Sequence, residues 1–187
     1  VLNSSSNKDI DIAAFAIAMM NQMEAIFDQT VAKDDKTLDF DVSFMALIGI
    51  VNDKKDVAKD ETLIEIKDSD HKDFKSKDPY TKIVGVALSG KEIEINEAFV
   101  DDMIKGRNVK TLPHEAGHTA GLKHPLHDFK KIFFGMFTEE GDTFNSPKTN
   151  FMYQGGVPAP TGPTRQQMER MLRLYESGFL NQSTGIH

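Results

Sequence analysis

The sequence contains no cysteine. Disulfide bonds, thiolate metal ligands and a cysteine nucleophile are therefore excluded. It also lacks an apolar run near the ~18 residues that a membrane-spanning helix needs. The longest candidate, 13–20, leads directly into Asn21 and Gln22. We therefore expect no transmembrane segment.

The chain is also not basic: it has 22 lysines and arginines and 29 aspartates and glutamates, which gives a net charge of −7. The lysines that recur in 54–82 are interleaved with acidic residues, which is typical of a solvated surface. Phosphate binding needs clustered basic residues, so we do not expect nucleic acid as a partner.

The chain shows no signal peptide and opens Val-Leu-Asn-Ser-Ser-Ser without a methionine. This beginning predicts a processed form or an excised domain. Its 187 residues, 39% hydrophobic and 27% charged, fit a single domain with a core of its own. Residues 1–9 are mostly polar, and we expect them to be disordered.

Apolar residues at three- and four-residue steps predict an amphipathic helix over 10–32. These positions are Ile12, Phe15, Met19, Met23, Ile26 and Phe27. A last helix is predicted over 164–177, where a glycine at 178 stops it. Three prolines mark the stretch before that helix as a loop: Pro158, Pro160 and Pro163.

Strands are predicted between these helices. Alternation over 38–44, continuing into apolar 45–51, predicts one strand, and 63–66 predicts another. Residues 83–88 and 93–96 predict two strands joined by a tight turn. Short helices are expected over 97–105 and from about residue 112. This order of elements favours an α/β or α+β fold, with its principal helices packed against one face of a sheet.

Residues 114–124 read His-Glu-Ala-Gly-His-Thr-Ala-Gly-Leu-Lys-His. On a helix, His114 and His118 lie one turn apart on the same face, so their imidazoles can bind one zinc ion. Glu115 lies about 100° around the helix, where its carboxylate can take a proton from zinc-activated water. Gly121 can adopt a positive φ and return the chain so that His124 supplies the third ligand.

Other interpretations stay open. His127 is a second candidate for the third ligand, and Glu139 or Glu140 could supply it from a downstream helix, as in gluzincins. Surface histidines on a helix, or a zinc site that is structural or catalytically inactive, would need no peptidase chemistry. The apolar run 129–137 is either a packed insertion or a contact surface for a partner or lipid.

Residues 114–124 resemble the zinc-binding signature HExxHxxGxxH of the metzincin clan of metallopeptidases. The clan also has a Met-turn, whose methionine lies beneath the zinc ligands. The segment 150–153 is similar to it, with Met152 as the methionine and Met136 as the competitor. The proline directly after the third histidine, Pro125, is similar to the residue that serralysins have at this position. Gln154 departs from their zinc-associated tyrosine, and their glycine-rich calcium repeats are absent, so the family within the clan is unassigned.

The resemblance implies a single catalytic domain over 1–187, with an upper lobe of about 10–121 and a lower lobe of about 122–187. The upper lobe would hold a twisted, mostly parallel sheet with an antiparallel edge strand and a backing helix. The active-site helix, the Met-turn and the C-terminal helix would complete the fold, with zinc in the cleft. No structural calcium ion is indicated, although the resemblance does not exclude one.

The resemblance further implies a protein or peptide substrate that pairs with the edge strand before the zinc helix. The best match is the strand 83–88, in which Gly85, Val86, Ala87 and Leu88 would line the substrate. The alternative is that Gly85 marks a bulge in an ordinary strand. Tyr153 would begin the wall of the pocket for the residue after the scissile bond.

We therefore predict a zinc-dependent endopeptidase, a secreted hydrolase in which Glu115 acts as the general base and then as the general acid. Two alternatives remain. One is a toxin or effector protease domain cut from a larger polypeptide. The other is a zinc-binding interaction module without turnover. The sequence does not indicate an oligomeric state.

Overall fold

A computed structural model describes residues 1–31, 40–124, 148–153 and 159–180. Its helices are α1 (Ile12–Phe27), α2 (Val100–Ile104), α3 (Thr111–Thr119) and α5 (Arg165–Glu176). Its strands are β1 (Leu2–Asn3), β2 (Gln29–Val31), β3 (Phe40–Val42), β4 (Leu63–Lys67), β5 (Gly85–Ser89) and β6 (Glu92–Asn96). The 3-10 turns η1 (Lys54–Asp56), η2 (Lys72–Phe74) and η3 (Glu97–Phe99) lie among them. None of the helices in these ranges is long and apolar enough to cross a membrane.

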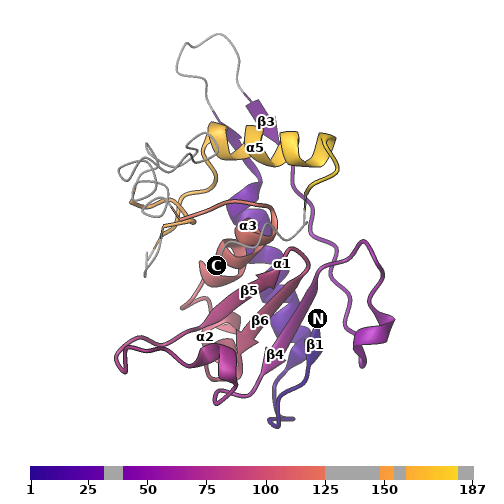
Figure 1. Cartoon of the computed structure of the whole chain (residues 1–187), viewed down its shortest axis with the longest axis vertical. Coiled ribbons are helices and arrows are strands. Elements are labelled where there is room, and N and C mark those ends of the chain that lie inside the picture. Colours follow the sequence, from indigo (N-terminus) through magenta and orange to yellow (C-terminus); the bar gives the residue numbers. More distant parts are fainter. Residues whose placement is uncertain (32–39, 125–147, 154–158, 181–187) are drawn as a thin grey trace.

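The central sheet has four strands in the order β1-β4-β6-β5 (Figure 1). β1 runs parallel to β4 and β4 runs parallel to β6, whereas the edge strand β5 runs antiparallel to β6. α1 lies across one face of the sheet and packs against α2 and α3. The chain is therefore a mixed α/β structure, as the sequence predicts, and the strands predicted at 63–66, 83–88 and 93–96 are confirmed.

The two faces of the sheet differ because successive side chains on a strand point in opposite directions. On one face, Ile66, Ile93 and Ile95 are buried together with Phe15 and Met19 of α1. On the opposite face, Glu65 of β4 lies in register with Glu94 of β6. Both carboxylates are buried, so this second face carries buried charged groups.

Three sequence predictions of element bounds are wrong. Residues 1–9 are not disordered, because β1 pairs with β4 and Ser5 is buried. The first helix does not reach residue 32: Asp28 adopts extended backbone, and the chain enters β2, which pairs with β3. Of the strand predicted over 38–51, β3 covers 40–42, and 43–51 forms no regular element.

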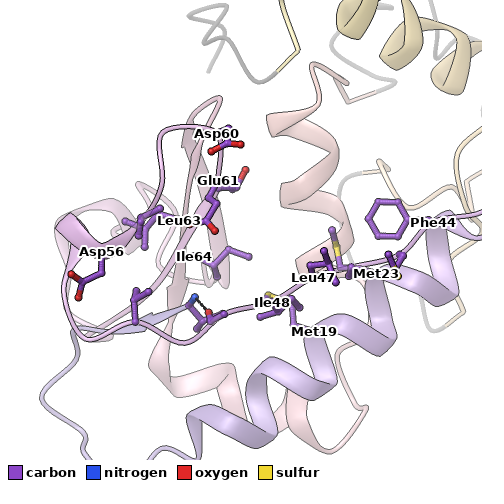
Figure 2. A pocket seen from close by; sticks show the side chains of 17 residues that line it. Met19, Met23, Phe44, Leu47, Ile48, Asp56, Asp60, Glu61, Leu63 and Ile64 are labelled. Carbon is purple, nitrogen blue, oxygen red and sulfur yellow. Dashed lines mark hydrogen bonds between the residues drawn. The ribbon is translucent and has the colours of Figure 1, made fainter.

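A cavity of about 450 Å³ opens between α1, residues 44–51 and residues 56–64 (Figure 2). Its walls are largely apolar, and carboxylates from the 56–61 segment lie at one side. The labelled apolar residues are Met19, Met23, Phe44, Leu47, Ile48, Leu63 and Ile64. No residue of α3 or of the turn after it lines this cavity, so it is separate from the histidines of the 114–124 motif.

The buried carboxylate of Glu65 has three donors. Lys54 Nζ lies at 2.7 Å, Lys67 Nζ at 2.8 Å and Ser4 Oγ at 2.5 Å. Burial by itself raises the pKa of Glu65, but hydrogen bonds from these three donors outweigh it and hold the pKa below its usual value. The ionised form of Glu65 is therefore the one that the fold stabilises.

Glu65→Gln should lower the free energy of unfolding by about 1–3 kcal/mol at neutral pH, because charge-assisted hydrogen bonds are lost. A carboxylate with a depressed folded-state pKa stabilises the fold above its unfolded pKa, and that contribution disappears as the pH falls through the folded pKa. Urea unfolding should therefore show the deficit shrinking below about pH 4. The exposed Asp70→Asn is the control, and a deficit independent of pH would contradict this account.

Candidate metal centre

Helix α3 carries the first two histidines of the motif and ends in a tight backbone reversal. Gly121 has φ +83°, and its N–H donates to the carbonyl of His118 at 3.0 Å. The N–H of Leu122 donates to the carbonyl of Gly117 at 2.9 Å. These two bonds form a Schellman motif, which needs a left-handed residue and so favours glycine. The positive φ lies at the residue where the sequence predicts it.

This reversal brings His124 back to the helix face that carries the other two histidines. The Nε2 atom of His124 lies 2.9 Å from Nε2 of His114 and 3.0 Å from Nε2 of His118. The three rings therefore present the same ring nitrogen to one point. Tetrahedral zinc with Zn–N bonds near 2.0–2.1 Å separates two ligand nitrogens by about 3.3 Å. The two distances from His124 are within a few tenths of an ångström of that spacing, and all three ligand atoms lie within 4.8 Å of one another.

Backbone carbonyls orient two of the rings. Nδ1 of His114 lies 2.8 Å from the carbonyl oxygen of Phe151, and Nδ1 of His118 lies 2.9 Å from that of Leu122. A carbonyl only accepts, so each Nδ1 carries the proton and each Nε2 keeps its lone pair, as a metal ligand requires. Burial, and to a lesser degree the neighbouring His118, lowers the pKa of His114 to about 3. His114 is therefore neutral at ordinary pH.

Glu115 projects from the same helix turn into the interface between α3 and β5. It is buried, and its Oε2 accepts a hydrogen bond from the backbone N–H of Ala87 at 2.9 Å. Burial raises the pKa of Glu115 to about 7, although the bond from Ala87 acts in the opposite direction. A desolvated carboxyl group with this pKa, one residue from a histidine cluster, is suited to taking up and releasing a proton.

β5 is the outer strand of the described sheet, and α3 packs against it. A Cβ at Gly85 would lie 3.0 Å from Thr111 Cγ2 and 3.3 Å from Glu115 Cγ. The lack of a side chain at Gly85 therefore makes room for α3. The alternative of a bulge at Gly85 is wrong, because the register shift lies between Ala87 and Ser89.

The backbone of β5 has a definite inner and outer edge. The carbonyl of Val84 accepts from the N–H of Asn96 on β6. Antiparallel pairing alternates, so Val86 also faces β6, while Gly85 and Ala87 turn their N–H and C=O groups away from it. The Ala87 N–H is bonded to Glu115. The carbonyl of Ala87 and both groups of Gly85 therefore lie along the outer edge, beside the carboxylate.

The turn at 150–153 lies beneath α3. The N–H of Tyr153 donates to the carbonyl of Asn150 at 2.9 Å, and Met152 is fully buried. Gly117 of α3 faces this turn, because a Cβ there would overlap Met152 Sδ and lie 2.9 Å from Phe151 Cε2. The turn thus supports the helix from below while its Phe151 carbonyl orients His114.

Several supporting residues were missed by sequence reasoning. Asn150 and Gln167 of α5 exchange two hydrogen bonds between their side-chain amides, at 3.0 and 3.2 Å, and both are fully buried. Gln167 also forms a capping box with Thr164, and the spacing Thr-x-x-Gln is a signal that could have been used. Arg170 Nε donates to the carbonyl of Gly121 at 3.0 Å, so α5 braces the reversal.

Lys110 is a further supporting residue without a sequence signal. It is buried, its Nζ donates to the carbonyl of Tyr153, and burial lowers its pKa. The side chain of Tyr153 is half-buried, and its backbone closes the turn beneath α3 instead of joining the histidines. The other candidates all fall outside the described residues: Pro125, His127, 129–137, Met136, Glu139, Glu140 and Gln154.

Gly117→Ala should destabilise the protein by about 1–3 kcal/mol, because the added methyl group collides with Met152 and Phe151. The sign is diagnostic, since alanine would otherwise stabilise a helix interior by about 1 kcal/mol relative to glycine. Thermal unfolding measures the change. Gly49→Ala is the matched control, because nothing lies within 4 Å of its Cβ position. A stabilised Gly117→Ala would contradict the contact.

No protein-family model matches this chain, and no curated protein matches it. Three features of the described residues bear on function. These are three convergent imidazoles, a desolvated carboxyl group beside them, and the edge strand to which that carboxyl group is bonded.

Proposed function

We propose that this protein is a zinc-dependent endopeptidase of the metzincin type. The observation that carries the proposal is the convergence of three imidazoles, with Nε2 of His124 about 3 Å from Nε2 of both His114 and His118. His114, His118 and His124 would hold the ion, and Glu115 would be the catalytic acid–base group. The substrate would be a peptide or an extended segment of a protein, and the site of action extracellular.

The donor set fits zinc. Three neutral imidazoles that leave one coordination position open are a ligand set of catalytic zinc sites. Two of the rings have Nδ1 committed to backbone carbonyls, which favours the tautomer that binds metal through Nε2. When bound, zinc would supply Lewis acidity, polarising a substrate carbonyl and making water easier to deprotonate.

Glu115 would move the proton. Its burial makes the charged form less favourable than in water, so the carboxylate readily accepts a proton from the attacking water. The Ala87 N–H fixes one of its oxygens and so restricts how the carboxylate can turn. The protonated Glu115 would then donate to the leaving amine. A purely structural metal site has no use for such a group, which favours the enzyme over a non-catalytic zinc module.

The edge of β5 would bind the substrate backbone. Its outward Gly85 groups and its Ala87 carbonyl offer the pairing positions that strand addition requires, next to Glu115. Val86 and Leu88 remain candidates for contacts with substrate side chains, and the division into lobes at about residue 122 remains a prediction. Met152, buried beneath α3 against Gly117, would be the methionine of the Met-turn.

Glu115→Gln should reduce kcat/KM for peptide cleavage by about 10²–10⁴-fold, because an amide cannot take a proton. The amide oxygen can still accept from Ala87, so folding and zinc content should stay at the parent level. His118→Ala should lose both zinc and cleavage. Metal analysis and digestion of an unbiased peptide library measure the two properties.

The exposed Glu176→Gln of α5 is the control for these variants. Full cleavage by Glu115→Gln would remove Glu115 from the mechanism. Stoichiometric zinc in a parent chain that cleaves nothing would support the non-catalytic module instead.

In the metal-free protein, stability should depend on pH through Glu115. A carboxyl pKa raised to about 7 in the folded state stabilises the fold fully below its unfolded value of about 4.3, and this contribution is lost as the pH rises through 7. Parent stability should therefore fall relative to Glu115→Gln by about 3 kcal/mol between pH 4 and 8. Urea unfolding with a chelator present measures this difference. Parallel curves for the two proteins would contradict the buried position of the carboxylate.

A further inference from the structure

A second group of potential metal ligands lies on the charged face of the sheet, opposite α1. His71 and Asp73 come from the chain between β4 and β5, and Glu94 comes from β6. Nδ1 of His71 lies 3.3 Å from Glu94 Oε2 and 3.5 Å from Asp73 Oδ2. One ligand atom from each residue can be chosen so that all three lie within 4.8 Å of one another.

Glu94 differs from its neighbour Glu65 in how its charge is compensated. The two stand in register on adjacent strands and are both buried, at 6% and 3% exposure. Glu65 has two lysines and a serine hydroxyl within 2.8 Å. Glu94 has one lysine, Lys67, and only at 4.0 Å from Oε1. Burial therefore raises the pKa of Glu94, while that of Glu65 is lowered.

The cluster contains buried polar atoms that lack hydrogen-bond partners. Oε2 of Glu94 and Nδ1 of His71 are both buried and make no hydrogen bond. Their 3.3 Å separation is close enough for an ion pair but does not have hydrogen-bond geometry. One oxygen of Glu94 and one nitrogen of His71 are thus directed at each other, and neither has a hydrogen-bond partner among the described residues. Buried polar atoms without partners are rare and call for an explanation, such as an ion.

We propose that His71, Asp73 and Glu94 form a second metal site, which binds a divalent zinc ion in a structural role. One imidazole and two carboxylates are ligands that zinc accepts, and a hard cation such as calcium prefers oxygen alone. The ion would neutralise both carboxylates at once. This site shares no residue with the cluster at 114–124 and does not depend on the proposed peptidase activity.

The site would fasten the chain between β4 and β5 to the sheet. η2 lies within this chain and contacts β5, and Phe74 of η2 is buried beside the His71 ring. The same chain leads directly into β5, whose Ala87 holds Glu115. An ion at His71, Asp73 and Glu94 would therefore stabilise the strand on which the candidate active site is built.

Zinc stoichiometry tests the proposal. The parent chain, dialysed against zinc and then against metal-free buffer, should retain two equivalents by metal analysis. His118→Ala combined with His124→Ala should retain one. Adding Glu94→Gln to this pair should remove the last equivalent and abolish the rise in Tm that zinc produces. Asp70→Asn, an exposed acid of the same chain segment, should leave the stoichiometry unchanged.

The outcomes separate the two sites. A double histidine variant that retains no zinc, or a Glu94→Gln variant that retains as much as its parent, overturns the second site. One equivalent that is lost with Glu94→Gln alone supports the second site while contradicting the three-histidine centre. If Glu94→Gln fails to fold by circular dichroism, His71→Ala, whose side chain is only partly buried, must remove the same equivalent.

Discussion

The whole candidate centre depends on one backbone reversal. A helix places His114 and His118 on one face, but continuing it would carry the next histidine away from them. The left-handed conformation of Gly121 ends α3 with two hydrogen bonds to the carbonyls of the last turn. Since only glycine adopts that conformation at little cost, a single residue decides whether His124 joins the other two. α5 holds the reversal in place from outside through Arg170.

Two glycines, Gly85 and Gly117, then determine the position of α3. At Gly85, strand β5 comes close enough to α3 for the Ala87 N–H to bond to Glu115. At Gly117, the turn that carries Met152 comes close enough for the Phe151 carbonyl to bond to His114. A methyl group at either position would separate these layers. Glu115 and His114 are therefore both positioned by close backbone approach to α3, and both approaches depend on glycine.

The two faces of the sheet differ in charge. The α1 face is apolar, and α3 packs at its edge. The other face buries carboxylates, of which Glu65 is paired with lysines and Glu94 is directed at His71 and Asp73. Burying a charge is unfavourable unless a partner compensates it. Glu65 and Glu94 occupy equivalent strand positions, but only the charge of Glu65 is compensated by close lysines. This difference distinguishes the second cluster from an ordinary ion-pair network.

The sequence alone determined what depends on near neighbours. Helical spacing put His114 and His118 on one face, Gly121 allowed the reversal, and short strand-like segments predicted β4, β5 and β6, because backbone preferences and residue patterns are local properties. Only the tertiary structure decided which distant groups meet. It joined Glu115 to Ala87, Asn150 to Gln167, and Glu94 to His71. Such meetings follow from strand register and from the packing of whole layers, and no short stretch of sequence contains that information.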